Sequence, residues 1–319
     1  MANDQGGNKV NNIKILFLSG GTGTPKLLQG TTNIIDPRNI TIVGNTGDDW
    51  NFYGLHVSPD IDSILLTLTN LIDTEKWWGI KEDTFNLIKF LRTHLKEDIW
   101  FNLGDLDAGL CLYRSNLLKQ GLSLTKATDI IRKRLTIESC ILPMADQPVQ
   151  TKVRTPERTM HLQEFWVKYK GKPNVMNVFF EGDLGKTTNS VLDIIKTAEI
   201  IIIGPSNPIS SIGPILAISP IREALRNTSA HRIAISPIIG TNSVSGPTFT
   251  FLRSWGKIVS PLTIVEMFND VLDGFMIHKT DSELSSEIQK MGVNPIVDDI
   301  YIHTSSDATR LIMKMLDSK

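Results

Sequence analysis

Ile13-Lys-Ile-Leu-Phe-Leu-Ser-Gly-Gly-Thr-Gly-Thr-Pro-Lys26 joins an apolar run to a glycine-rich turn. The apolar run is typical of a buried β-strand, and Leu27 and Leu28 begin a helical pattern directly after the turn. We expect Thr24 to be the N-cap and Pro25 the first helical residue, because proline lacks a donor that a helix start leaves unpaired anyway. The segment therefore predicts strand, turn and helix, with the helix N-terminus facing the glycines.

The same alternation recurs along the chain. A second strand is expected at 40–43, and a helix is expected to begin at Ser58-Pro59. Further helices and strands are expected later in the chain, with helices at 190–198 and 219–226 and strands at 199–203 and 232–236. This alternation predicts an α/β fold, a Rossmann-like doubly wound parallel sheet.

The order of these patterns also predicts the domain organisation. Residues 1–12 are expected to be a flexible tail, and 13–70 with 186–319 the Rossmann-like nucleotide-binding core. Residues 71–185 are expected to form an inserted α+β subdomain that covers the substrate edge of the sheet. Its first part, to about residue 135, has mostly helical patterns, whereas short apolar-polar alternations at 149–153 and 160–169 predict strands.

Composition excludes several classes of function. The formal net charge of the 319 residues is −1, so nucleic acid is not an indicated partner. Cys111 and Cys140 form no metal-binding or disulfide pattern, which is typical of a reducing cytoplasm. No apolar run approaches the length of a membrane span, and no signal peptide is evident. We therefore expect a cytoplasmic protein without a membrane partner.

The glycine-rich turn is suited to phosphate binding, because glycine lets backbone N–H groups approach a ligand closely. It is not a Walker A motif, since Lys26 is followed by Leu27 and not by Ser or Thr. It also lacks the third glycine of the nicotinamide fingerprint, whose position is taken by Lys26. A phosphate site and a purely structural turn both remain open from this motif alone.

Acidic residues follow at two places expected to lie at the same sheet edge. Asn45-Thr-Gly-Asp-Asp49 ends the second strand, and Asp60 with Asp62 lies in the first turn of the next helix. Carboxylate and amide oxygens suit a hard divalent metal, but adjacent acids also solvate turns and helix starts. Two later loops, at 204–214 and at 236–240 with 245–247, also follow strands and complete the outline of a nucleotide-sized cleft.

Taken together, these motifs resemble the 2-phospho-L-lactate transferase (CofD) family. The likeness runs from about residue 13 to about residue 278 and includes one further motif, Trp77-Trp-Gly79, whose rings either stack on a ligand or pack in the core. The resemblance implies a homodimer that uses Mg²⁺. It also implies transfer of a phosphorylated three-carbon acid from a guanosine diphosphate-linked donor to the ribityl hydroxyl of the deazaflavin FO. GMP is then released during coenzyme F420 biosynthesis.

The resemblance also implies roles for particular residues. Asp48 and Asp62 would bind the metal, and Asp62 would orient or deprotonate the attacking hydroxyl of FO. Asp62 and Asn102 would contact FO, although the family has a basic residue where this chain has Asn102. A second basic residue of the family is replaced by Leu106, and we expect Arg114 or Lys81 to supply the missing charge. The donor phosphates and nucleotide would be bound by Gly20, Gly21, Thr22, Gly23, Thr24, Asn45, Ser206, Asn207 and Ser236.

Two other functions compete with this one. The nearer is a non-enzymatic protein that binds a nucleotide sugar for regulation, as in the YvcK-like branch of the superfamily, which Trp77-Trp-Gly79 and Gly204-Pro-Ser-Asn-Pro208 argue against. The more distant is a nicotinamide-dependent dehydrogenase, which the incomplete glycine fingerprint disfavours. Whether the donated acid is phospholactate, phosphoenolpyruvate or phosphoglycerate depends on a few pocket contacts that a sequence pattern does not specify.

Overall fold

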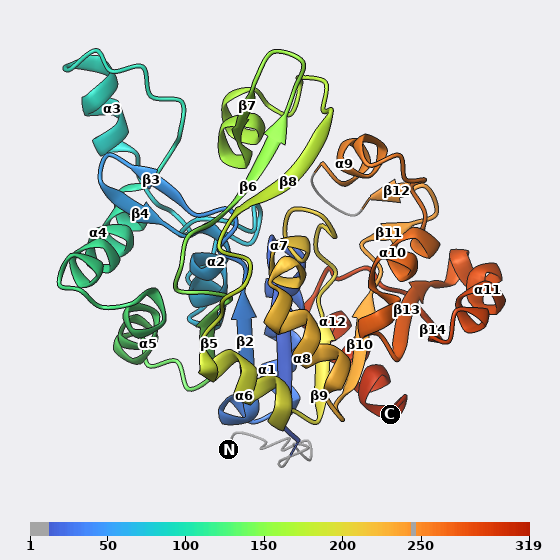
Figure 1. Ribbon diagram of the computed structural model, residues 1–319. Helices are drawn as coiled ribbons and strands as arrows, with labels where there is room; N and C mark the ends of the chain where they lie inside the picture. Colours follow the sequence, from blue (N-terminus) through green and yellow to red (C-terminus); the bar gives the residue numbers. More distant parts are fainter. Residues whose placement is uncertain (1–12, 244–246) are drawn as a thin grey trace.

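A computed structural model describes residues 13–243 and 247–319, so the predicted tail 1–12 and part of the loop at 245–247 lie outside the described residues. The core is a seven-stranded parallel sheet in the order β14-β13-β10-β9-β1-β2-β5 (Figure 1). This sheet confirms the predicted α/β, Rossmann-like architecture. Its strands are β1 (Ile15–Ser19), β2 (Ile40–Gly44), β5 (Cys140–Pro143), β9 (Ile200–Ile203), β10 (His231–Ile235), β13 (Gly274–His278) and β14 (Asn294–Asp298).

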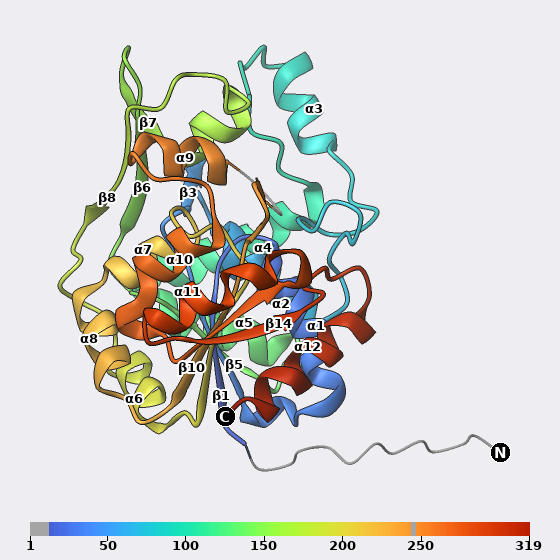
Figure 2. The same ribbon diagram turned by 90° about the vertical axis from the view of Figure 1, so that its right-hand side faces the viewer.

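The central strands are apolar along their whole length because helices cover both faces of the sheet. All residues of β1 and β9 are buried, and the two strands pair in parallel from Ile15 opposite Ile200. Figure 2 shows α1 and α12 on one side of the sheet and α6 and α8 on the other. The helices are α1 (Gly23–Ile34), α2 (Pro59–Leu68), α4 (Asp105–Lys119), α5 (Leu124–Arg134), α6 (Asn189–Thr197), α7 (Gly213–Ala217), α8 (Ser219–Asn227), α9 (Thr248–Ser254), α10 (Pro261–Phe268), α11 (Ser285–Lys290) and α12 (Ser305–Asp317).

The strand order reverses beside β1. The chain runs from β1 through β2 to β5 on one side, then returns to β9 on the other side of β1 and continues to β14. Open α/β sheets bind ligands outside the carboxyl ends of the strands at such a reversal. The glycine-rich turn after β1 and the loop after β9 meet at this point. In the described part of the chain, no helix combines the length and apolarity that crossing a bilayer requires.

Smaller elements complete the segment expected as an insert. The antiparallel sheet β7-β6-β8 rises above the carboxyl edge of the central sheet (Figure 1). Part of the segment, β5, belongs to the central sheet itself. The remaining elements are β3 (Trp50–Phe52), β4 (Leu55–Val57), α3 (Asn86–Thr93), β6 (Val149–Arg154), β7 (Thr159–His161), β8 (Asn177–Gly182), β11 (Ile238–Ile239), β12 (Asn242–Ser243), a π-helical turn at Glu164–Lys168 and 3₁₀ turns at Pro37–Asn39, Asn269–Val271 and Lys279–Leu284.

Two local predictions were wrong, and a third holds for only part of its range. Helix α1 begins at Gly23 with Thr22 as its N-cap, because the hydroxyl of the expected cap, Thr24, faces the loop after β9 instead. The alternation at 160–169 forms a strand only to His161, after which the chain turns into the π-helical segment. The segment from 71 to about 135 was expected to be mostly helical. It contains α3, α4 and α5, but its first part, 71–85, forms turns and one isolated bridge.

Candidate active site

The glycine-rich turn packs tightly against the loop that follows β9. A Cβ on Gly23 would lie 2.0 Å from the carbonyl oxygen of Pro205, so no side chain fits there. The hydroxyls of Thr24 and Ser206 lie 3.1 Å apart and share a buried hydrogen bond. Gly21 has a φ of +59°, a conformation that favours glycine. The turn therefore needs its glycines both for its shape and for contact between the two loops.

Three predicted donor-binding residues shape the loops with their side chains. The Asn45 amide donates to Asp60 (2.8 Å) and accepts from the N–H of Gly47 (2.7 Å). The Asn207 Oδ1 accepts from the N–H groups of Ile209 and Ser210, at 2.9 and 3.0 Å. The Ser236 hydroxyl donates to the carbonyl of Ile238 at 2.6 Å. All three side chains are buried, so their hydrogen bonds set the backbone conformation at the sheet edge.

A pocket of about 210 Å³ opens between these loops. The glycine-rich turn, the loop after β2 and the loop after β9 all line it, and so does the segment that covers the sheet edge. Trp166 of the π-helical turn also lines the pocket, and its side chain is 45% exposed. The structure thus brings predicted residues from three loops to one cavity, whose lining is Gly21, Thr22, Asp48, Leu162, Gln163, Trp166, Asn207, Ser210, Ser211 and Pro247.

Asp48 and Asp60 form a pair of buried carboxylates beside this pocket. Burial and repulsion from Asp60 raise the pKa of Asp48 well above its usual value, against hydrogen bonds from Asn45 and Thr151. Burial also raises the pKa of Asp60 to about 6, although Asn45 and the N–H of Gly21 donate hydrogen bonds to it. Neither carboxylate makes an ion pair with a lysine or arginine of the described chain. Two desolvated carboxylates without a counter-ion fit a hard divalent cation such as Mg²⁺.

Asp62 lies two residues after Asp60 on α2, in a different environment. Both of its carboxylate oxygens accept hydrogen bonds from Arg114 on α4, at 3.1 Å for Nη1 and at closer range for Nη2. The Arg114 guanidinium is fully buried and also donates to the carbonyl of His56 at 3.2 Å. The charge of Asp62 raises the pKa of Arg114 despite that burial. Arg114, one of the two residues expected to supply a missing charge, is therefore the counter-ion of Asp62.

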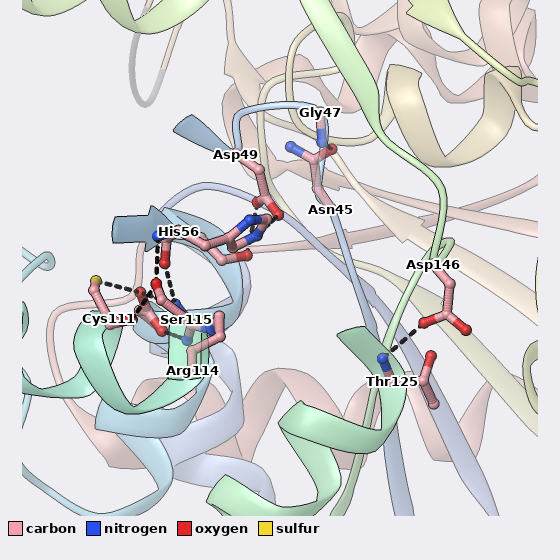
Figure 3. A network of polar contacts seen from close by, with 11 residues as sticks. Asn45, Gly47, Asp49, His56, Cys111, Arg114, Ser115, Thr125 and Asp146 are labelled. Carbon is pink, nitrogen blue, oxygen red and sulfur yellow. Dashed lines mark hydrogen bonds and ion pairs between the residues drawn. The ribbon is translucent and has the colours of Figure 1, made fainter. Parts of the chain in front are cut away.

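A polar network joins the loop after β2 to α4 (Figure 3). Asp49 accepts hydrogen bonds from Ser58 at 2.6 Å and from the His56 ring at 2.8 Å. Burial raises the pKa of Asp49, and these two partners oppose the rise. The His56 backbone N–H donates to Ser115 on α4 at 2.7 Å. This network positions the start of α2, which carries Asp60 and Asp62.

The Trp77-Trp-Gly79 turn lies against α1 and α4. The ammonium of Lys26 is 5.2 Å from the ring centre of Trp77. A Cβ on Gly79 would lie 3.1 Å from the Asp107 carboxylate. Burial raises the pKa of Asp107 to about 6, with smaller contributions from the charges of Asp62 and Asp83. The Trp77-Trp-Gly79 turn thus lies between α1 and the carboxylate of Asp107, which interacts with the charge of Asp62.

Asn102 is exposed, and its Oδ1 accepts a hydrogen bond from Arg92 of α3 at 2.8 Å. Arg92 also donates to the carbonyl of Ile99 at 2.7 Å. A guanidinium therefore lies beside the position where the family resemblance implied a basic residue. Sequence reasoning missed Arg92 because it lies ten residues earlier, on α3, whereas Asn102 lies in the loop before α4. It also missed the placement of Asp60 and Asp107, whose acidic motifs are visible in the sequence but whose partners are not.

Known proteins resemble this chain over almost its whole length. The 2-phospho-L-lactate transferase CofD family matches residues 15–314. A 2-phospho-L-lactate transferase of Methanococcus maripaludis is 37% identical over 96% of this chain and 98% of its own length. One from Methanocaldococcus jannaschii is 36% identical, over 95% and 97%. A UPF0052-family protein from Bacillus halodurans, 17% identical, shares the fold with a TM-score of 0.64, over 95% of this chain and 99% of its own. The chain therefore belongs to the 2-phospho-L-lactate transferase CofD family, a family of enzymes.

Proposed function

We propose that this enzyme transfers a 2-phospholactyl group from a guanosine diphosphate-linked donor to the ribityl hydroxyl of FO, in coenzyme F420 biosynthesis. The observation that carries the proposal is the pocket at the strand-order reversal, where the glycine-rich turn, Asp48 and Asn207 meet beside Trp166. A family match over residues 15–314 supports the phospholactyl group. Phosphoenolpyruvyl and phosphoglyceryl groups are the alternatives that the experiment below separates.

The proposed reaction is a displacement at phosphorus. The hydroxyl oxygen of FO bonds to the phosphorus that carries the acid, and the bond from that phosphorus to the bridging oxygen breaks. The bridging oxygen leaves with its electron pair as part of GMP, and the hydroxyl proton passes to a carboxylate. Such a transfer requires in-line positioning and neutralisation of phosphate charge more than covalent help from the protein.

The residues of the pocket fit the donor side of this reaction. Gly21, Thr22, Gly23 and Thr24 surround the N-terminus of α1, where unpaired N–H groups favour phosphate. Asp48 would hold Mg²⁺, which supplies positive charge to the phosphate oxygens. Gly20 lies in contact with Ser211 and supports the turn.

The acceptor side contains Asp62. Its carboxylate would orient the FO hydroxyl or take its proton, while Arg114 holds it in place. Its role as a metal ligand stays a prediction, because a cation would have to replace Arg114 at one of its oxygens. Asp60, which is buried next to Asp48 and has no cationic partner, is the better candidate for a second ligand.

The test mixes the protein, Mg²⁺, FO and each candidate donor, and follows products by mass spectrometry. We expect equal amounts of GMP and of the phospholactyl adduct of FO. An adduct with another acid would correct the donor. No adduct, together with tight binding of a nucleotide sugar, would favour the regulatory alternative.

A homodimer also remains a proposal. The α3 region exposes Phe85, Phe90 and Leu95, each between 41% and 56%, and a second copy of the chain would cover such side chains. Sedimentation of the full chain should give twice the monomer mass of 35.5 kDa. A monomeric species at micromolar concentration would remove the dimer from the proposal.

A further inference from the structure

Lys26 lies in the first turn of α1, directly after the glycine-rich turn, and has no role so far. It is half-buried, and that burial lowers the pKa of its ammonium group. Across 13–243 and 247–319, no carboxylate pairs with this ammonium, which instead lies over the ring of Trp77. By contrast Lys152, whose side chain is 19% exposed, is paired with Glu181. A partly desolvated cation without a counter-ion is unfavourable on its own, and a bound anion would offset this cost.

The helix that carries Lys26 has an unusual N-terminus. α2 and α4 carry aspartates in their first turns, where a carboxylate complements the helix dipole. α1 has no acidic residue there, and its N-cap Thr22 makes no capping hydrogen bond. Lys26 is the fourth residue of this helix, although a cation is disfavoured at the positive end of a helix. The helix end and the ammonium thus add positive charge within the first turn of α1, which directly follows the pocket-lining residues Gly21 and Thr22.

The Trp77 turn holds Lys26 in this place. Trp77 has a φ of +61°, which is rare for a bulky residue, and its N–H donates to the carbonyl of Asp73 at 2.7 Å. Asp73 donates in turn to the carbonyl of Gly79 at 2.9 Å. A cation–π contact with an indole ring in such a fixed turn limits the freedom of the long lysine side chain. The ammonium is therefore oriented before any ligand binds.

We infer that Lys26 contacts the diphosphate of the donor and neutralises the charge that develops on the bridging oxygen as its bond to the transferred phosphorus breaks. This inference rests on the proposed function and adds a catalytic residue to it. As the hydroxyl oxygen of FO bonds to phosphorus, the electron pair of the broken bond goes to the bridging oxygen of GMP. A lysine ammonium at that oxygen supplies three donors and a full positive charge.

The test compares binding of GDP and GMP, because only GDP has a second phosphate for Lys26 to contact. We expect Lys26→Met to weaken GDP binding about tenfold or more in calorimetric titration, and GMP binding much less. Lys26→Arg should retain most of the GDP affinity, because it keeps the charge. Lys196→Met, at the exposed end of α6, is the control and should bind both nucleotides like the unchanged protein.

Thermal unfolding separates this role from a structural one. Lys26→Met removes an unpaired, half-buried charge, so the free protein should unfold at the same or a higher temperature. The rise in Tm that GDP causes should shrink, because ligand binding stabilises the folded state according to its affinity. A lower Tm of the free Lys26→Met protein would indicate that Lys26 acts in folding, and would overturn the inference.

The remaining outcomes distinguish Lys26 from the function as a whole. If the unchanged protein forms the FO adduct and Lys26→Met binds GDP equally well, the Lys26 inference fails and the proposed function stands. If no adduct forms but inorganic pyrophosphate binds the unchanged protein more tightly than Lys26→Met, the function fails and the phosphate contact stands. Equal pyrophosphate binding without an adduct overturns both.

Discussion

Asp60 and Asp62 lie in the same turn of α2, yet their surroundings differ in every respect. Asp60 faces the loop after β2, where burial beside Asp48 raises its pKa to about 6 and no cation compensates its charge. Asp62 faces α4, where the fully buried Arg114 binds both of its oxygens. Their two-residue spacing turns them by about 200° around the helix axis. We therefore assign one aspartate to the proposed donor side of the site and the other to the proposed acceptor side.

The two carboxylates are therefore suited to opposite tasks. Asp60 is unstable as an anion until a cation arrives, which favours binding of Mg²⁺. Asp62 is paired with Arg114 and has a fixed geometry, which favours orientation of a hydroxyl. Each prediction below changes one member of the comparison.

The largest effect is expected from Arg114→Met. The substitution leaves Asp62 buried without its counter-ion, so the free energy of unfolding should fall by about 3–5 kcal/mol. Urea unfolding measures it, with Arg38→Met as control, since Arg38 is 72% exposed and its ion pair with Asp36 lies at the surface. The double variant with Asp62→Leu should recover stability. Equal stability of Arg114→Met and the control would show that the pair contributes nothing.

Asp62→Asn should reduce turnover by about a hundredfold or more, because proton transfer to a positioned carboxylate contributes that much. The KM for the donor should stay near its original value, since the donor lies on the side of Asp60. Initial rates at saturating FO measure this, and Asp193→Asn, an exposed aspartate on α6, provides the control. Undiminished turnover would remove Asp62 from the mechanism.

Asp60→Asn should stabilise the protein at high pH when divalent cations are removed with EDTA. A carboxyl whose pKa is raised in the folded state binds its proton more tightly there than in the unfolded state. Stability therefore falls as pH rises from about 4 towards the folded pKa of about 6. At pH 8 the variant should gain on the order of 3 kcal/mol.

Thermal unfolding at pH 4 and pH 8 measures this gain, which should shrink towards the lower pH. Added Mg²⁺ should raise the stability of the unchanged protein at pH 8 and that of Asp60→Asn less. A variant less stable than the unchanged protein at pH 8 in EDTA would show that the hydrogen bonds of Asp60 outweigh its buried charge.

The smallest effect is expected from Arg92→Gln, at the outer end of the acceptor side. Because this guanidinium is partly exposed, stability should change by less than about 1 kcal/mol. The KM for FO should rise a few-fold while kcat stays unchanged. This pattern is expected when a contact is lost that binds the ground state and the transition state equally. An unchanged KM would show that Arg92 only supports the loop at Asn102.

Much of the fold follows from local pattern. The apolar runs at β1, β2 and β9 predict buried parallel strands because helices cover both faces of the sheet. Helix α2 was expected to begin at Ser58-Pro59, and it begins at Pro59. The cap of α1 could not be predicted, because the hydroxyl of Thr24 is used by Ser206, which lies far away in the sequence.

The sequence by itself determined the α/β class, the glycine-rich turn and the acidic motifs, since these depend on periodicity and backbone conformation within a few residues. Tertiary structure alone decided which charges meet. It placed Arg114 on Asp62, left Asp48 and Asp60 together without a cation, and set Lys26 over Trp77. The physical reason is that burial and ion pairing depend on neighbours supplied by other helices and loops, and a linear pattern contains no distance between them.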